Sequence, residues 1–249
     1  MKVVFLTRTG IRGLVSMVVL LACFIGLSLI YLNQASIATK LNEPVYQGNS
    51  GKKMVAITVN VDWGEEYIPL MLEEFKKNDA VVTFYVTGKW AEKNSALLKQ
   101  MARAGHSVQN HGYSHLHFNN LARQDISEQI KKAESIINKT TGKNPAFFAP
   151  PYGEQNRQVV SVASELGYTL TMWSVDTIDW QRPSPDVIVK RVLNQVHNDA
   201  IILMHPTAPT VKALPDMLGG LKEEGYKMVA IDKIIIDRQT EAQPDAKNR

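Results

Sequence analysis

Met54–Val61 reads MVAITVNV, and its density of Val, Ile and Thr predicts a buried β-strand. Glu66–Asn78 follows with apolar residues at helical spacing, and Ala80–Val86 forms a second strand-like run. A strand, a helix and a strand in this order predict parallel neighbours in one sheet, because parallel strands need a crossover connection.

The same alternation continues to residue 230. Asn94–Ala104 is a predicted helix that Gly105 ends, and Asp125–Asn138 is another, with Asp125 as its cap and Glu128 three residues on. The apolar stripe of this second helix, expected in the core, is Ile126, Ile130, Ala133 and Ile137. Further strands are predicted at residues 107–109, 146–148, 168–175, 200–204 and 227–230. About six or seven strand–helix units favour an α/β fold closed into a (β/α) barrel over an open doubly wound sheet.

The distribution of charge excludes a nucleic-acid-binding footprint. Four of the 28 basic residues and none of the 24 acidic residues lie within residues 1–40, so the remainder holds 24 of each sign. A remainder without net charge predicts no broad basic surface for nucleic acid. The single cysteine, Cys23, excludes an intrachain disulfide.

Leu14–Leu32 is a run of nineteen residues without a charge, preceded by Lys2, Arg8 and Arg12. This length and flank predict a transmembrane anchor with the N-terminus in the cytoplasm and the rest of the chain outside. Cleavage near Ala38, which would release a secreted protein, is the alternative. The predicted organisation is a basic N-terminus (1–13), an anchor or uncleaved signal (14–32), a linker (33–51), a folded domain (52–235) and a polar tail (236–249).

Polar side chains of metal-binding and acid–base types follow five of the predicted strands. His111 and His115, four residues apart, are expected on one side of a helical turn, where two imidazoles can bind one divalent cation. Because barrel sites gather at the C-terminal strand ends, one site is expected there. Its candidate residues are Asn60, Asp62, His111, His115, Tyr152, Asp176, Asp179, Trp180 and His205.

Six motifs occur in the order known from one enzyme family. They are Thr83-Phe84-Tyr85, Gly105-His106, Asn110–His115, Pro150–Gly153, Asp176 with Asp179-Trp180, and Leu203-Met204-His205. Over Lys52–Ile235 the chain resembles the polysaccharide deacetylases with a NodB homology domain, carbohydrate esterase family 4, and most of all their branch from endospore-forming bacteria. The resemblance implies a distorted (β/α) barrel that hydrolyses N-acetyl groups on cell-wall glycan, either peptidoglycan or a chitin-like polymer, with a link to spore formation. It also implies a divalent metal, usually zinc, with cobalt or another divalent ion as alternatives.

Carried onto this chain, the resemblance assigns His111, His115 and Asp62 to the metal. It assigns His205 to the general acid. The backbone N–H of Tyr152 is expected to donate a hydrogen bond to the oxyanion. Trp180 and Tyr152 are expected to bind the substrate.

The chain departs from the family pattern where the general base should stand. On this alignment the base falls on Asn60, and an amide cannot accept the proton. This alignment leaves one spacer residue, Val61, between the base at Asn60 and the metal ligand Asp62. An alternative alignment without a spacer places Val61 at the position of the metal aspartate. The arginine that pairs with the base is replaced by Ala149, and Asp176 and Asp179 remain as substitute bases.

Three functions are therefore expected from the sequence. The first is an anchored, metal-dependent deacetylase of cell-wall glycan with weak activity. The second is a catalytically inactive glycan-binding or structural protein of the cell wall or spore with the same fold. The third is a different amide hydrolase that uses Asp176 or Asp179 as its base. Of the four tryptophans only one or two are expected to line a glycan groove, and His106, His117 and His197 are given no catalytic role.

Overall fold

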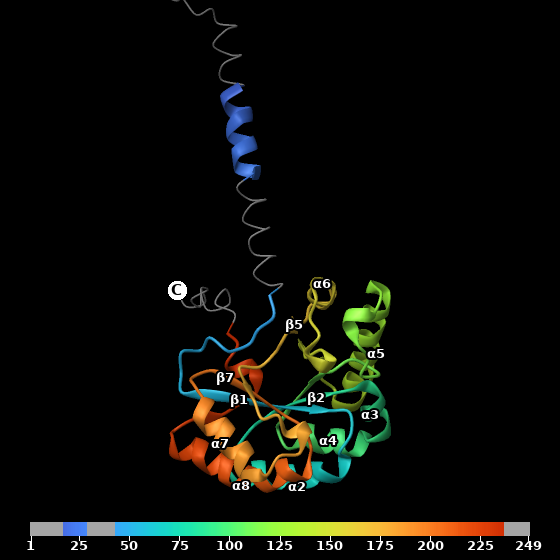
Figure 1. Ribbon diagram of the computed structural model, residues 1–249. Helices are drawn as coiled ribbons and strands as arrows, with labels where there is room; N and C mark the ends of the chain where they lie inside the picture. The colour runs from blue at the N-terminus through green and yellow to red at the C-terminus, as the bar shows by residue number, and fades with distance from the viewer. Residues whose placement is uncertain (1–16, 29–42, 237–249) are drawn as a thin grey trace, which may run out of the picture. The chain divides into compact units, whose positions relative to one another are not determined.

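A computed structural model describes residues 17–28 and 43–236 of the chain (Figure 1). Residues 17–28 are helical. The chain divides into two units, Met1–Glu43 and Pro44–Arg249, and each is described by itself. The predicted anchor Leu14–Leu32 lies partly outside the described residues. Within them, no helix combines the length and the apolar character that crossing a bilayer requires.

The folded unit is built on one parallel sheet. Its strands pair in the order β5-β4-β3-β2-β1-β7-β6, while β8 pairs with the start of β1. Among the described residues no strand pairing joins β5 to β6, so the sheet curls without closing by a strand ladder. The strands are β1 (Met54–Val61), β2 (Thr83–Val86), β3 (Ser107–Asn110), β4 (Phe147–Phe148), β5 (Thr169–Leu170), β6 (Val175–Asp176), β7 (Ala200–Met204) and β8 (Lys227–Met228).

The predicted strand at residues 168–175 is wrong as one element. Its two ends belong to opposite edges of the sheet, because β5 pairs with β4 and β6 pairs with β7. The segment before β1 bridges these two edges of the sheet. Its Val45 forms a bridge with Thr171, which follows β5, and its Gln47 forms a bridge with Ala200 of β7. The apolar run therefore crosses from one edge of the sheet to the other.

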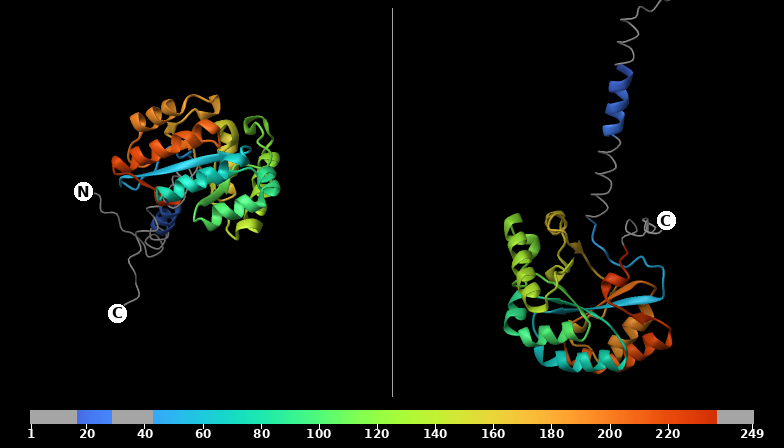
Figure 2. Two further views of the ribbon diagram at one scale, coloured as in Figure 1. Left: turned by 90° about the horizontal axis from the view of Figure 1, so that it is seen from below. Right: turned by 180° about the vertical axis from the view of Figure 1, so that it is seen from behind.

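Helices cover the outer face of the curled sheet. Neighbouring helices pack in the order α7, α8, α2, α4, α5 and α6, which follows the order of the strands they connect (Figures 1 and 2). The helices are α2 (Ile68–Lys77), α3 (Gly88–Lys93), α4 (Ser95–Arg103), α5 (Arg123–Thr141), α6 (Arg157–Glu165), α7 (Pro185–Gln195) and α8 (Ala208–Glu223). Short 3-10 turns are η1 (Glu65–Tyr67), η2 (Phe118–Asn120), η3 (Pro151–Gly153), η4 (Asp179–Gln181) and η5 (Ile231–Lys233).

Helix α5 begins two residues before its predicted start. Ala122 stands at its N-cap position without a side-chain cap, so the prediction that Asp125 caps the helix is wrong. Asp125 lies in the first turn, where its negative charge favours the positive end of the helix dipole. The predicted core stripe is confirmed, since Ile126, Ile130, Ala133 and Ile137 are all buried.

Strand β1 divides its side chains between two cores. Val55, Ile57, Val59 and Val61 pack with the outer helices, whereas Ala56 packs with Tyr85 and Ile201 under Ile231 and Ile234. Because successive strand residues face opposite sides, Thr58 and Asn60 share the inner face with Ala56. The carboxyl end of β1 therefore delivers its polar side chains to the inside of the curl.

Candidate active site at the carboxyl ends of the strands

The end of β1 supplies Asn60 and Asp62. Val61 lies between them with no exposed surface and packs in the outer core, so it is turned away from both. The alignment that places Val61 at the metal position therefore puts a buried apolar side chain where a ligand is needed. Asp62 is held by Thr87, whose hydroxyl donates to Asp62 Oδ1 at 2.7 Å.

Asn60 is buried, and its Oδ1 has no hydrogen-bond partner among the described residues. A buried acceptor left unpaired costs about 1–3 kcal/mol. Such a cost is typical of a polar group that a site keeps for a ligand or a bound water. The strand register places Asn60 at the carboxyl end of the sheet. Asn60 pairs with Tyr85 of β2, and the preceding residue, Val59, pairs with Met204, the last residue of β7.

The two motif histidines lie in an irregular loop, so the predicted helical turn is wrong. Gly112 and His115 both have left-handed backbones, with φ of 75° and 49°. The loop is held by the start of α3, where the N–H groups of Gly88 and Lys89 donate to the carbonyls of Gly112 and Tyr113, each at 2.9 Å. Backbone contacts far apart in sequence, rather than helical spacing, bring the imidazoles together.

The rings of His111 and His115 lie with their centroids 5.1 Å apart. Nδ1 of His111 bonds the Ala149 carbonyl at 2.7 Å, which leaves Nε2 as the free nitrogen. Burial, together with the neighbouring His115 and His205, lowers the pKa of His111 to about 3. Burial also lowers the pKa of His115, against the opposing charge of Asp62. Both rings are therefore neutral at physiological pH, which is the form that binds metals.

The types of donor in this set suit a divalent metal. Two neutral imidazoles and the Asp62 carboxylate would leave coordination positions open, as catalytic zinc sites require. The described residues hold no group of three or more His, Cys, Asp or Glu side chains already arranged as a metal site. The donor chemistry fits, and the structure does not show an assembled centre.

His205 follows β7 and is held by Asp179. The Asp179 carboxylate is fully buried and accepts from Nδ1 and the backbone N–H of His205 and from the hydroxyl of Thr210. A buried carboxylate with these three donors has no access to substrate or water. Asp176 accepts from the N–H of Ile178 and so shapes the turn before η4. The geometry thus gives both aspartates structural roles and does not favour either as a substitute base.

Three exposed aromatic side chains stand beside these polar groups. Trp63, Tyr152 and Trp180 are 39%, 58% and 55% exposed. The indole of Trp63 lies parallel to the His205 ring, with an angle of 7° between planes and 6.2 Å between centroids. Of the other two tryptophans, Trp90 is buried and Trp173 is half-buried, so Trp63 and Trp180 are the two that offer exposed rings.

The positions of Trp63 and His117 were missed by sequence reasoning. The sequence does not distinguish Trp63 from the other tryptophans and assigns His117 no catalytic role, yet the ring of His117 stacks on Tyr152. The signal for Trp63 was its place directly after Asp62 at a strand end. His117 offers only its spacing of two residues from His115.

A family model described as polysaccharide deacetylase matches residues 47–171, half of the chain. The chain is also 33% identical to a peptidoglycan-N-acetylglucosamine deacetylase of Bacillus cereus, over 75% of this chain and 70% of that protein. The chain belongs to the polysaccharide deacetylase family.

The chain is similar to two further proteins. It is 42% identical to the uncharacterized protein YlxY of Bacillus subtilis, over 78% of this chain and 60% of the length of YlxY. The crystal structure of wild-type BA3943 of Bacillus anthracis, described as a CE4 family pseudoenzyme, is 41% identical with a TM-score of 0.75, over 78% of this chain and 69% of that one. A mutant of BA3943 is described as having restored enzymatic activity, at 40% identity, the same TM-score, and over 78% and 71% of the two chains.

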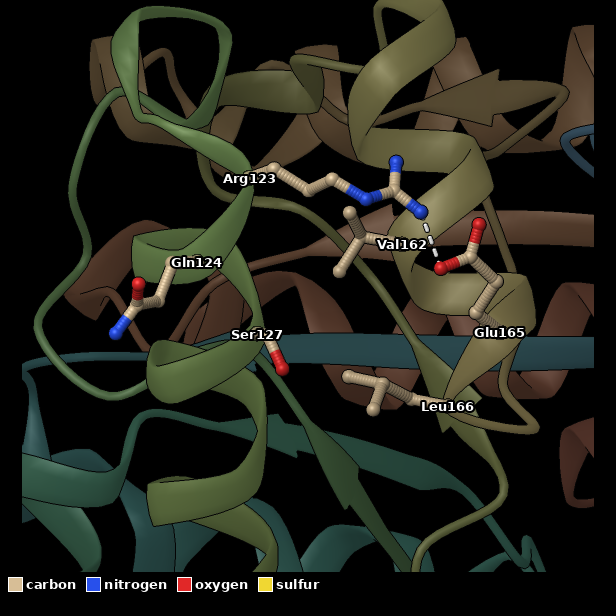
Figure 3. A pocket seen from close by; sticks show the side chains of 6 residues that line it. All are labelled: Arg123, Gln124, Ser127, Val162, Glu165 and Leu166. Atoms are coloured by element: carbon tan, nitrogen blue, oxygen red, sulfur yellow. Dashed lines mark ion pairs between the residues drawn. The ribbon is translucent and has the colours of Figure 1, made fainter.

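A hollow of about 390 Å³ lies apart from these residues, between α5 and α6 (Figure 3). Arg123 and Glu165 form an ion pair across it. Its lining contains none of the residues of the candidate active site, and consists of Arg123, Gln124, Ser127, Val162, Glu165 and Leu166.

Proposed function

We propose that this deacetylase-family protein binds an N-acetylated cell-wall glycan at a site that lacks its general base, and that it releases little or no acetate. The observation that carries the proposal is Asn60. It stands at the carboxyl end of β1 on the inner face of the sheet, and an amide cannot take a proton from water at neutral pH.

Among the described residues, we infer that neither of the two candidate substitutes, Asp176 and Asp179, supplies the base. Asp179 is enclosed by its three hydrogen bonds, and Asp176 serves the turn that follows it. Asp62 is the remaining carboxylate at this strand end, and its proposed role is that of a metal ligand.

The relatives support the same reading. BA3943, which shares 41% of its aligned residues with this chain, is described as a pseudoenzyme, and activity is described as restored in one of its mutants. The relative from Bacillus cereus is named for peptidoglycan N-acetylglucosamine. We therefore propose peptidoglycan as the glycan, with chitin-like oligomers as usable analogues.

In this proposal His111, His115 and Asp62 hold a divalent metal, zinc or alternatively cobalt. The bound ion would supply electrophilic polarisation of the acetyl carbonyl. His205, fixed by Asp179, holds a proton near the sugar nitrogen, and the backbone N–H of Tyr152 faces the carbonyl oxygen. Trp180 and Trp63 offer exposed indole faces to the sugar rings.

A weak deacetylase is the second candidate. The groups assigned to the metal and His205 are retained, and a positioned base contributes about 10²–10⁴-fold to the rate. Turnover slowed by that factor, rather than abolished, would distinguish this candidate from a pure binding protein.

The test compares acetate release by the full-length chain, loaded with zinc or cobalt, on acetylated chito-oligomers and peptidoglycan. The variants are Asn60→Asp, His111→Ala and the double variant, with Asn194→Asp as a control for the charge change at an exposed position of α7. We expect wild type and Asn194→Asp to bind oligomers without measurable release. We expect Asn60→Asp to gain at least about 10²-fold, and His111→Ala to remove that gain together with the bound metal.

Two results would contradict the proposal. Wild-type release as fast as that of Asn60→Asp, and lost in His111→Ala, would mean a true deacetylase whose base lies elsewhere. Failure of wild type to bind any acetylated oligomer or peptidoglycan would exclude the glycan-binding function.

We also propose that the chain is anchored in the cell membrane by Leu14–Leu32, with the folded unit outside the cytoplasm. The support is the uncharged run and its basic N-terminal flank. Fractionation of cells is the test. Recovery of the full-length chain from membranes, accessible to external protease, is expected, whereas a shortened form in the medium would indicate cleavage near Ala38.

A further inference from the structure

Tyr152 combines a left-handed backbone with an exposed side chain. Its backbone is left-handed, with φ of 58°, a conformation that bulky side chains seldom adopt. Its side chain is 58% exposed, so burial does not hold it there. A strained residue persists only when its surroundings hold it, and the contacts that hold Tyr152 must come from outside the core.

The ring of His117 supplies one such contact. It lies on the Tyr152 ring with centroids 4.0 Å apart and an angle of 11° between planes. On the side of the active site, the ring of His115 meets Tyr152 at 4.6 Å and 69°. Tyr152 is therefore held between a surface histidine and a histidine assigned to the metal.

His117 is itself fixed by the loop that follows Tyr152. Its Nδ1 bonds Glu154 Oε1 at 2.8 Å, and Glu154 Oε2 accepts from the backbone N–H of Asn119 at 3.0 Å. Partial burial would raise the pKa of Glu154, but these hydrogen bonds outweigh it and lower the pKa. The carboxylate is therefore ionised and available as an acceptor at neutral pH.

A second set of bonds ties the same two loops together. The backbone N–H of Asn156 donates to Asn119 Oδ1 at 2.9 Å, and the side-chain amide of Asn156 donates to the Asn119 carbonyl at 3.3 Å. We call His117, Asn119, Glu154 and Asn156 the Tyr152 bracket. It joins the loop after His115 to the loop after η3, so it links the two segments that carry His115 and Tyr152.

We propose that His117, braced by Glu154, is a positioning residue that fixes Tyr152 for recognition of the N-acetyl group of a glycan. The inference rests on the proposed function for its ligand. Since the bracket lies outside the motifs and touches Tyr152 rather than the reacting atoms, its effect should fall on discrimination between acetylated and de-N-acetylated sugars. The folded state as a whole should change little, because His117 is exposed.

The experiment has two readouts on the full-length chain. Calorimetry compares binding of tetra-N-acetylchitotetraose with binding of its de-N-acetylated counterpart. Amide hydrogen exchange follows Gly153 and Glu154, whose N–H groups bond the carbonyls of Pro150 and Pro151 in the turn around Tyr152. The variants are His117→Ala, which removes the stack and the bond, and His117→Phe, which keeps the stack. His197→Ala, at a half-buried histidine elsewhere in the fold, is the control.

We expect wild type and His197→Ala to prefer the acetylated oligomer by about tenfold or more, and His117→Ala to lose most of that preference. Exchange at Gly153 and Glu154 should quicken about tenfold in His117→Ala. His117→Phe should recover most of both properties.

Unchanged exchange in His117→Ala would overturn the positioning role without reference to any glycan. Faster exchange with an unaltered preference for the acetylated oligomer would overturn the recognition role. If exchange responds but wild type binds neither oligomer, the proposed function fails and the recognition role falls with it, while the hold on Tyr152 stands.

Discussion

Asp179 holds His205 at two points, through Nδ1 at 2.8 Å and through the backbone N–H at 2.6 Å. The hydroxyl of Thr210 adds a third bond to the same carboxylate at 2.6 Å. Because Nδ1 is engaged, Nε2 is the nitrogen of His205 left for chemistry. The aspartate thus acts on the site through the histidine, and the chain keeps this acid–histidine pair even though the base position holds Asn60.

We predict that Asp179→Asn lowers the free energy of unfolding by about 1–3 kcal/mol, because a single amide oxygen cannot accept all three donors. In the Asn60→Asp background it should also reduce acetate release. Urea denaturation and the acetate assay measure the two effects. Asp176→Asn is the matched control, since its amide oxygen can still accept from Ile178. Equal stability and equal activity for the two substitutions would show that the buried bonds do not position His205.

We predict that Gly64→Ala is more damaging than Gly105→Ala. Both glycines have left-handed backbones, with φ of 82° and 87°. A Cβ on Gly64 would stand 2.3 Å from the Pro206 carbonyl oxygen, whereas one on Gly105 meets nothing within 4 Å. Each substitution should cost about 1–2 kcal/mol for the backbone, and Gly64→Ala about 1–3 kcal/mol more for the clash.

Chemical denaturation of the two variants isolates this difference. Gly64 follows Asp62 and Trp63, and Pro206 follows His205. The extra loss of stability in Gly64→Ala therefore reports how closely these two strand-end loops approach each other. Equal losses of stability would mean that these loops can separate freely. In that case the close approach of Trp63 and His205 would not be a fixed feature of the site.

The alternation of strands and helices was predictable because it depends on local residue pattern. Met54–Val61 and Ala200–Met204 are strands at their predicted bounds, since each is a compact apolar run buried in the centre of the sheet. The run at 168–175 failed because its pairing changes partners across the sheet. Nothing within those residues records that β5 joins β4 while β6 joins β7.

The strand-end residues of the site were predictable, but their arrangement was not. His111 and His115 meet because Gly112 and His115 take left-handed backbones and α3 binds the loop carbonyls. These interactions join segments distant in sequence. Asp179 could be read as a base or as a support from its residue type alone, and only its complete burial separates the two.

We predict that stability falls as pH falls below about 6.5, in part through His106. Its Nδ1 accepts from the Val82 N–H at 3.2 Å, its ring meets the edges of Phe75 and Phe84, and burial lowers its pKa from 6.5 to about 4. The unfolded chain therefore binds the proton first. The stabilisation is complete above pH 6.5 and is lost as pH falls towards 4, with a magnitude on the order of 3 kcal/mol.

Urea denaturation of wild type and His106→Gln between pH 7.5 and 4.5 tests this. Glutamine keeps an acceptor for Val82 but takes up no proton, so the variant should be less stable than wild type at pH 7.5 and lose less stability on acidification. His111, whose pKa is also lowered by burial, should leave a residual slope of the same sign in the variant. If the free energies of unfolding of the two proteins fall in parallel with pH, burial does not lower the pKa of His106. The acid sensitivity would then arise from other groups.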